Sequence, residues 1–336
     1  MMLARSVRDA RRPRRGRWLL KALAALVIAW LVIDKAASIV APEPRVGHWR
    51  SAEAQEAYSI AYREVMADLP APTRVLDVQT GHGSIHVLEW VGEEAGPPVL
   101  LVPGHSSGAP MWSENLPAWI GKRTVYAFDP LADAGFSAQR RPLRGFDEQA
   151  EWISQALAGL GVDRAHVVGH SFGSATAAAF AVRHPEQVAS LALLEPVIVL
   201  RPLPASALFW GTVTQLPVPQ SLQDRALAEI GGTTVAEVQE RTPMSVMIDA
   251  AASGYSTEMP LPREITDAEW RGLDMPLRVD IAGAQSLAGG QDAVDRLRRL
   301  RPDAAVTLWP AATHSLPMQE RAAIGPALLE FWQTNS

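Results

Sequence analysis

The sequence predicts an α/β protein with a doubly wound, mostly parallel sheet, and two observations lead to this fold class. From residue 97 onward, short runs rich in β-branched residues alternate with longer helix-like segments. Around Ser171, a strand-like run, a serine between two glycines and a helix-like run follow one another directly. A parallel sheet with helices on both faces accommodates this order.

The elements are expected in the following order. A helix at 52–68 precedes a β-hairpin, whose alternating segments at 74–78 and 85–91 flank Gly81 and Gly83. Further strands are expected at 98–102, 124–128, 165–169, 189–194, 277–282 and 304–309. Further helices are expected near 147–160, 172–184, 289–300 and 318–333.

This alternation stops between Pro196 and Met275. The 80 residues of this stretch are rich in proline and contain helix-forming patches, but no strand–helix–strand unit fits them. We interpret residues 196–275 as a helical lid inserted before the penultimate strand. The lid would divide the sheet domain into residues 74–195 and 276–336.

The N-terminus combines a basic head with an apolar run. Residues 1–17 hold seven arginines and one aspartate, so they carry +6 and the remainder −11 of the net charge of −5. An apolar run interrupted only by Lys21 follows. We predict a cytoplasmic head at 1–17, a single-pass transmembrane signal anchor at 18–40, and a spacer and helix at 41–73. The alternative is a signal peptide cleaved near residues 36–38 and export of the mature chain. Either way, the folded body would lie outside the cytoplasm.

The composition argues against several other functions. The chain contains no cysteine, which removes disulfides, thiolate metal sites and a cysteine nucleophile. It contains no H-E-x-x-H motif, Walker-type loop or G-x-G-x-x-G loop, so we expect neither a metal nor a cofactor. The arginines at 296–301 alternate with apolar residues, as on a solvated helix face, and we expect no nucleic-acid partner.

Ser171 is the candidate nucleophile. It stands in Gly169-His-Ser-Phe-Gly173, between the strand expected at 165–169 and the helix expected at 172–184. The glycines would let the backbone turn sharply and leave the serine exposed at the turn. A serine hydroxyl is a weak nucleophile, so it needs a nearby base and a third group that orients the base.

Over residues 74–333, the chain resembles the α/β-hydrolase fold family, in the branch that carries a lid. The resemblance rests on the serine motif, Val102-Pro-Gly-His-Ser-Ser-Gly108 followed by Trp112, Phe128-Asp-Pro130 and the loop around His314. It implies an oxyanion hole made by the backbone N–H groups of His105 and Phe172. Relatives carry a histidine where this chain has Pro103. The change should do little harm, because the required donor is a backbone N–H. The resemblance gives Asp129 a structural role.

The order of the family's catalytic residues, serine, then acid, then histidine, identifies His314 as the candidate base. Only His184 and His314 follow Ser171 in the chain. His184 ends the helix that begins at the serine, so it is directed away from the turn. His314 follows the last predicted strand, in a loop that can reach the carboxyl edge of the sheet.

Glu195 is the candidate acid. Relatives usually carry an aspartate shortly after the strand placed here at 277–282, where this chain has Gly283-Ala-Gln-Ser286 and no carboxylate. Some members place the acid directly after the strand that precedes the lid, which is where Glu195 stands. Asp280, within a strand, and Asp292, at a helix start, are the other candidates considered.

The resemblance implies a serine hydrolase that cleaves carboxylic esters or related acyl substrates, small or lipid-like, through an acyl-enzyme. Ser171 would attack the carbonyl carbon, His314 would transfer the proton, and Glu195 would orient His314. Two alternatives remain open at this stage. An acyltransferase would use the same residues, and a ligand-binding member of the fold would use none of them for catalysis.

Overall fold

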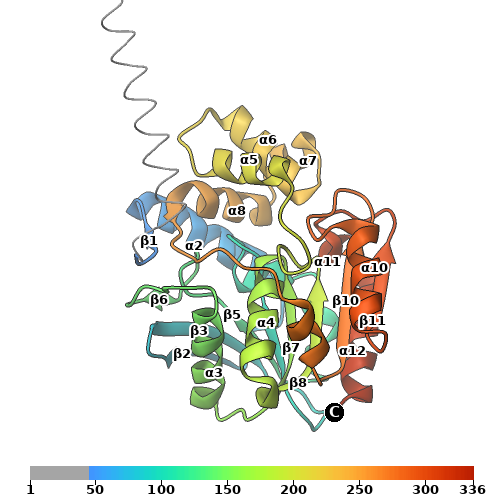
Figure 1. Ribbon diagram of the computed structural model, residues 1–336. Coiled ribbons are helices and arrows are strands. Elements are labelled where there is room, and N and C mark those ends of the chain that lie inside the picture. The colour runs from blue at the N-terminus through green and yellow to red at the C-terminus, as the bar shows by residue number, and fades with distance from the viewer. Residues whose placement is uncertain (1–44) are drawn as a thin grey trace, which may run out of the picture. The chain divides into compact units, whose positions relative to one another are not determined.

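The computed structural model describes residues 45–336 (Figure 1). The chain divides into two units, 1–44 and 45–336, and only the second is described below. The predicted basic head at 1–17 and the signal anchor at 18–40 lie outside the described residues. Among residues 45–336, every helix is too short or too polar to cross a membrane.

A nine-stranded, mostly parallel sheet forms the centre of residues 45–336. Its main path runs β11–β10–β8–β7–β4–β5–β3–β2, and β6 pairs with β3. Pairs that involve β3 are antiparallel, and the other pairs are parallel. The strands are β2 (Arg74–Gln79), β3 (Gly83–Trp90), β4 (Val99–Val102), β5 (Val125–Phe128), β6 (Ala138–Gln139), β7 (Ala165–His170), β8 (Val188–Leu194), β10 (Leu277–Ala282) and β11 (Ala305–Trp309). The parallel sheet predicted from the sequence is therefore confirmed.

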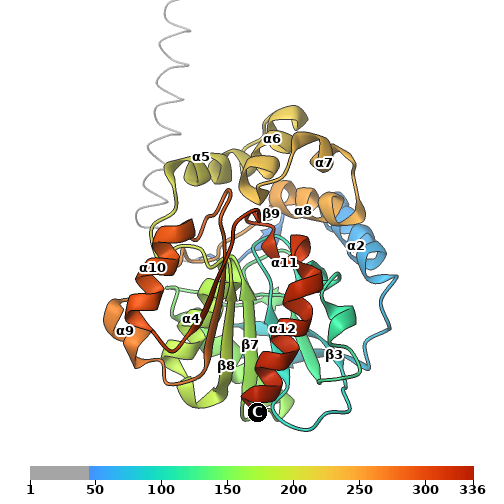
Figure 2. The same ribbon diagram turned by 90° about the vertical axis from the view of Figure 1, so that its right-hand side faces the viewer.

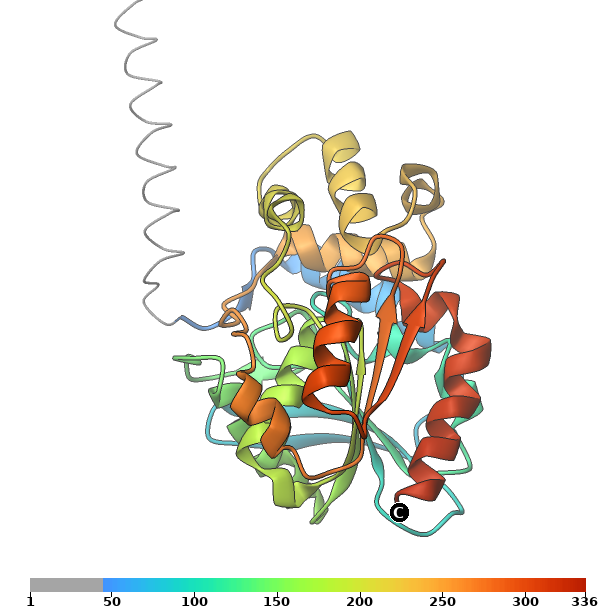
Figure 3. The ribbon, with the colours of Figure 1, turned by 45° about the vertical axis from the view of Figure 1, so that its right-hand side comes forward.

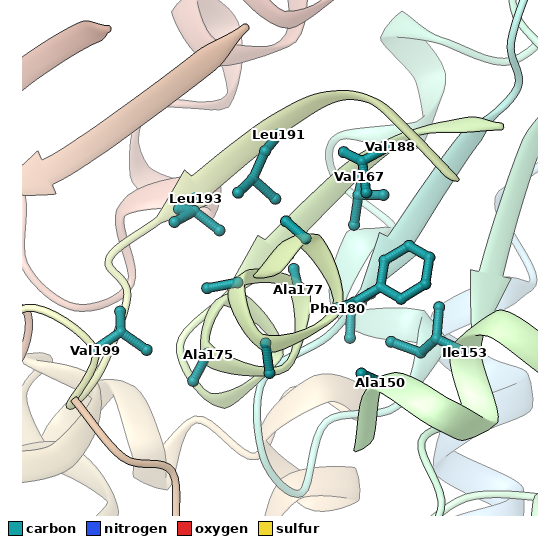
Figure 4. Close-up of a cluster of buried hydrophobic side chains, with 14 of the residues drawn as sticks. Ala150, Ile153, Val167, Ala175, Ala177, Phe180, Val188, Leu191, Leu193 and Val199 are labelled. Carbon is teal, nitrogen blue, oxygen red and sulfur yellow. The ribbon is translucent and has the colours of Figure 1, made fainter. Parts of the chain in front are cut away.

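Helices cover both faces of this sheet because alternate strand residues point to opposite sides. Val167 of β7 packs in one apolar core with α3 and α4, whereas its neighbour Val168 packs in a second core with α2 and α12. Figure 4 shows part of the first core, where Val167 of β7 and Ile153 of α3 lie beside Phe180 of α4. Figure 3 shows α10 and α12 on opposite sides of the sheet. The helices are α2 (Ala52–Met66), α3 (Glu148–Leu160), α4 (Phe172–Arg183), α10 (Gly290–Leu300), α11 (Leu316–Gln319) and α12 (Arg321–Thr334).

The stretch between β8 and β10 contains helices in place of a strand–helix–strand unit. Four of them gather beyond one end of the sheet (Figures 1 and 2): α5 (Ala205–Thr214), α6 (Gln220–Gly231), α7 (Val235–Gln239) and α8 (Pro243–Gly254). We call α5–α8 the inserted helices. The short strand β9 (Tyr255–Ser256) follows and pairs with β1 (His48–Trp49), and α9 (Asp267–Gly272) leads into β10.

Candidate active site

Ser171 occupies a strained turn between β7 and α4. Its φ of 54° and ψ of −122° lie in a region that residues other than glycine rarely adopt. The flanking glycines are required by close packing. A Cβ atom on Gly169 would lie 2.5 Å from the carbonyl oxygen of Gly173, and one on Gly173 would lie 2.2 Å from that of Val102. The turn therefore brings α4 against the end of β4 and places Ser171 at the carboxyl edge of the sheet.

Ser171, His314 and Glu195 form a continuous line of hydrogen bonds. The Oγ atom of Ser171 lies 2.9 Å from Nε2 of His314, and Nδ1 of His314 lies 3.0 Å from Oε2 of Glu195. With a proton on Nδ1, His314 donates to Glu195 and accepts the proton of the serine hydroxyl at Nε2. The three side chains follow three different strands, β7, β11 and β8, so the parallel sheet brings them together at one edge.

The carboxylate of Glu195 is fully buried and has four donors at 3.0 Å or less. Besides His314, they are the N–H of Ala282, the hydroxyl of Ser286 and the N–H of Leu287. Burial raises the pKa of Glu195, but hydrogen bonds from His314, Ser286 and Ala282 outweigh it, so that the pKa lies below its ordinary value. Glu195 is therefore ionised at neutral pH, as a group that stabilises an imidazolium must be.

The other acids and the other histidine considered from the sequence lie elsewhere. Asp280 binds Arg278 at 2.7 Å and the Trp309 indole at 2.9 Å. The Asp292 side chain is 87% exposed and lies 3.6 Å from Arg201. His184 contacts Glu151 near the far end of α4. None of these groups is among the hydrogen-bond partners that the described chain gives Ser171 or His314.

Of the two residues whose amides are expected to form the oxyanion hole, Phe172 follows Ser171 directly and His105 lies in the loop after β4. Phe172 is the first residue of α4, and a helix leaves its first N–H groups without an acceptor within the helix. The loop after β4 lies against the serine, since a Cβ atom on Gly104 would be 3.4 Å from Cβ of Ser171. The rings of His105 and Phe172 lie 5.5 Å apart, centre to centre.

Sequence reasoning missed His170, which supports the loop of His314. Its buried Nε2 donates to the carbonyl oxygen of His314 at 2.9 Å. Burial, reinforced by the nearby His314, lowers the pKa of His170 to about 3, so its ring is neutral. The only signal available in the sequence was its position beside Ser171.

Asp133 was also missed. It lies in the loop after β5, and its buried Oδ2 accepts the N–H of Ser106 at 2.8 Å. The same oxygen lies 3.1 Å from Nδ1 of His105. Burial lowers the pKa of His105, but the charge of Asp133 and its polar contact with the ring together outweigh burial and raise the pKa above its ordinary value. A carboxylate in a loop far away in the sequence carries no local sign of such a contact.

The inserted helices touch the loop that carries His314. The hydroxyl of Ser315 donates to the carbonyl oxygen of Gly231, at the end of α6, at 2.8 Å, and that of Thr313 does so at 3.3 Å. Ser171 is 8% exposed and His314 is 5% exposed. The candidate site is therefore largely closed in this conformation.

Within residues 45–336, no group of three histidine, aspartate or glutamate side chains is arranged to hold a metal ion.

Comparisons with known proteins agree with the fold. The model of the alpha/beta hydrolase fold family matches residues 97–233. The carboxylesterase YbfK of Bacillus subtilis is 23% identical over 278 residues, which cover 81% of this chain and 92% of the relative. The uncharacterised carboxylesterase nap of the same organism is 22% identical over 282 residues, covering 83% and 93%. The crystal structure of naproxen esterase from B. subtilis superposes with a TM-score of 0.75 at 22% identity, covering 84% of this chain and 99% of the other.

A parallel sheet that carries a serine on a strained strand–helix turn defines the α/β class of hydrolases. Residues 97–233 match the α/β-hydrolase fold family, and the chain is a hydrolytic enzyme.

Proposed function

We propose that the chain is a serine carboxylesterase with Ser171, His314 and Glu195 as its catalytic triad. The observation that carries this proposal is the line of hydrogen bonds from Ser171 through His314 to Glu195, at 2.9 and 3.0 Å. The match to two carboxylesterases over more than four fifths of the chain supports ester hydrolysis as the reaction.

The reaction follows from the placement of these groups. Ser171 Oγ attacks the ester carbonyl carbon while His314 Nε2 takes the hydroxyl proton. The N–H groups of His105 and Phe172 bind the oxyanion of the tetrahedral intermediate. His314 then protonates the leaving alcohol, and the acyl-enzyme remains. A water molecule, deprotonated by His314, releases the acid and restores Ser171. Glu195 stabilises the imidazolium in both halves of the reaction.

Two further parts of the proposal concern the rest of the chain. We propose that residues 196–275 act as a lid, because Gly231 contacts both neighbours of His314 and the site is largely closed. We also propose that residues 18–40 anchor the enzyme to a membrane with the catalytic body outside the cytoplasm, on the basis of the arginine-rich head and the apolar run. Small or lipid-like acyl esters are the substrate class.

The central test uses a Ser171→Ala variant. We expect it to fold, to lose hydrolysis of p-nitrophenyl esters and to lose covalent labelling by a fluorophosphonate. Ser253→Ala is a matched control, because the Ser253 hydroxyl bonds only within its own helix, to the carbonyl oxygen of Asp249 at 2.7 Å. Unchanged hydrolysis by folded Ser171→Ala would refute the assignment.

The same assay separates an esterase from an acyltransferase. Ser171 is 8% exposed, and an acyltransferase needs a site that keeps water from the acyl-enzyme, so transfer to an alcohol is the second candidate function. Products are therefore measured with and without an added alcohol. An esterase releases the free acid in both cases, whereas a transferase yields mainly the new ester.

The anchor is tested by fractionation. We expect the full-length chain to sediment with membranes and a chain that begins at Pro42 to remain in the supernatant. N-terminal sequencing that finds the mature protein beginning near residue 39 would show a cleaved signal peptide instead.

A further inference from the structure

The direction of the His105 N–H is set by the peptide group that carries it. In a planar trans peptide, the N–H of one residue points opposite to the C=O of the residue before it. The described chain contains no cis peptide bond, so the His105 N–H points opposite to the Gly104 C=O. Whatever holds the Gly104 carbonyl therefore also aims the His105 N–H.

The side chain of Ser107 holds this carbonyl. Its Oγ donates to the oxygen of Gly104 at 2.7 Å, and Ser107 is 5% exposed. Water therefore competes little for this bond. A hydrogen bond to the carbonyl end of a peptide also polarises the N–H end, which makes the N–H a better donor to a negative charge.

The next peptide group along the loop is held by Asp133. The N–H of Ser106 donates to Oδ2 of Asp133 at 2.8 Å, while Oδ1 accepts the N–H of Ala134 at 2.8 Å. Ser106 has a φ of 62°, in the left-handed region that favours glycine. A residue other than glycine keeps this conformation only where its surroundings hold it, and the buried carboxylate does so.

We propose that Ser107 and Asp133 are positioning residues that hold the His105 N–H toward the oxyanion of the reaction. The inference rests on the proposed esterase function and adds two residues to it. Ser107 fixes the peptide group that carries the donor, and Asp133 fixes the peptide group that follows. Neither side chain needs to touch the substrate. Their contribution is to prevent the loop from reorienting when negative charge forms on the substrate oxygen.

The test compares Ser107→Ala with Ser107→Thr. Removing an oxyanion-hole donor itself costs about 10²–10³ in kcat, and removing the group that aims it is expected to cost less, about tenfold. We expect Ser107→Ala to lower kcat by this factor with little change in KM, because the oxyanion that the N–H binds develops in the transition state and is absent from the bound substrate. Ser107→Thr retains the hydroxyl and is expected to recover most of the loss. Asp133→Asn is expected to lower kcat in the same manner.

A second measurement separates positioning from a general loss of structure. An aryl trifluoromethyl ketone binds the serine as a tetrahedral oxyanion, whereas the corresponding alcohol forms no such adduct. Ser107→Ala is expected to weaken binding of the ketone about as much as it lowers kcat, and to leave binding of the alcohol unchanged. Ser190→Ala is the matched control, since it removes another buried serine hydroxyl, which lies 2.8 Å from His166 Nδ1. Its ketone binding should equal that of the wild type.

The inference fails if folded Ser107→Ala retains the kcat and ketone affinity of the wild type. It also fails if ketone and alcohol binding weaken equally, or if Ser107→Thr recovers nothing. These outcomes are distinct from a failure of the proposed function. Hydrolysis by Ser171→Ala would remove the esterase assignment itself, whereas an inactive Ser171→Ala beside a fully active Ser107→Ala would remove only this inference.

Discussion

The carboxyl ends of β8 and β10 lie side by side, yet they contribute different chemistry to the candidate site. β8 is followed at once by Glu195, whose carboxylate binds His314. β10 is followed by a loop whose Ser286 stands near where relatives usually carry the acid. The two ends are in direct contact, because the Ser286 hydroxyl donates to Oε1 of Glu195 at 2.7 Å. The N–H of Glu195 in turn donates to the carbonyl oxygen of Asp280 at 2.8 Å.

This difference suggests a comparison between an acid placed after β8 and an acid placed after β10. The Ser286 hydroxyl contacts Oε1 of Glu195, whose Oε2 lies 3.0 Å from His314 Nδ1, so a carboxylate in the loop after β10 would lie near that nitrogen. With the carboxylate on β8, the loop after β10 supplies donors to it, namely the hydroxyl of Ser286 and the N–H of Leu287. Burying a charge is costly unless donors compensate it, so the two strand ends depend on each other.

The largest expected effect follows from removing the carboxylate of Glu195, directly after β8. Glu195→Gln keeps the shape of the side chain but cannot stabilise the imidazolium of His314. Loss of the corresponding carboxylate in serine proteases costs about 10⁴ in turnover, and we expect kcat to fall by about 10²–10⁴. Steady-state kinetics with a p-nitrophenyl ester measure the fall.

Two variants serve as controls for this result. Asp292→Asn changes an 87% exposed side chain, and Asp280→Asn changes one that pairs with Arg278, so both should remain far more active than Glu195→Gln. A nearly active Glu195→Gln beside an inactive Asp292→Asn would place the acid after β10 and contradict the assignment.

A smaller effect is expected from returning an acid to the loop after β10. Ser286→Asp in the Glu195→Gln background puts a carboxylate on the residue that now contacts position 195. We expect it to raise kcat about tenfold over Glu195→Gln alone. This gain is only part of the loss of about 10⁴ in kcat that removal of the carboxylate causes in serine proteases. The single variant Ser286→Asp is the comparison, because it brings two carboxylates together and should be less active than the wild type. Failure to recover any activity would show that an aspartate at 286 does not reach His314.

A still smaller effect is expected from Ser286→Ala. The variant removes one donor of Glu195 but leaves the N–H groups of Ala282 and Leu287 in place. A hydrogen bond to a charged group contributes about 1.5–3 kcal/mol to stability, and we expect the free energy of unfolding to decrease by about this amount. Urea denaturation measures the decrease, and Ser253→Ala should show little change. An unaltered unfolding free energy would mean that this bond contributes nothing in solution.

The smallest expected effect concerns stability at acid pH. Because the folded protein lowers the pKa of Glu195, its ionised form stabilises the fold above the unfolded value of about 4.3. This stabilisation is lost as the pH falls through the lower, folded value. Urea denaturation between pH 6 and pH 3 is therefore expected to show a smaller loss of stability in Glu195→Gln than in the wild type. Parallel curves for the two proteins would contradict the lowered pKa.

Much of the fold could be predicted from the sequence because its strands are short, apolar and separated by clear helical patterns. Ser171, His314 and Glu195, which the structure joins by hydrogen bonds, could also be predicted. The serine motif and the order of residues along the chain leave few choices for a base and an acid. The bounds of α5 have no clear pattern in the sequence because this helix has no polar face: Leu208 and Phe209 are 53% and 59% exposed, against the usual pattern of a surface helix.

Other features depend on contacts that no local pattern records. The inserted stretch is interrupted between α7 and α8, where Arg241 has a φ of 51°. β1 and β9 are two residues long, and they pair with each other although most of the chain lies between them in sequence. The contacts of His170, Ser107 and Asp133 became visible only once the loops around Ser171 were placed.

The small exposed area of Ser171 has a consequence for how the protein reacts with inhibitors. Because Ser171 is only 8% exposed, a reagent needs a passage through the surrounding residues to reach it. Two fluorophosphonates with the same leaving group but different bulk present the same chemistry to the serine, so a difference in their labelling rates measures passage to the site. A bulky reagent whose rate no longer depends on its leaving group would report the opening rate of the helices themselves. That outcome would support the proposed lid, whereas a rate that always follows the leaving group would contradict it.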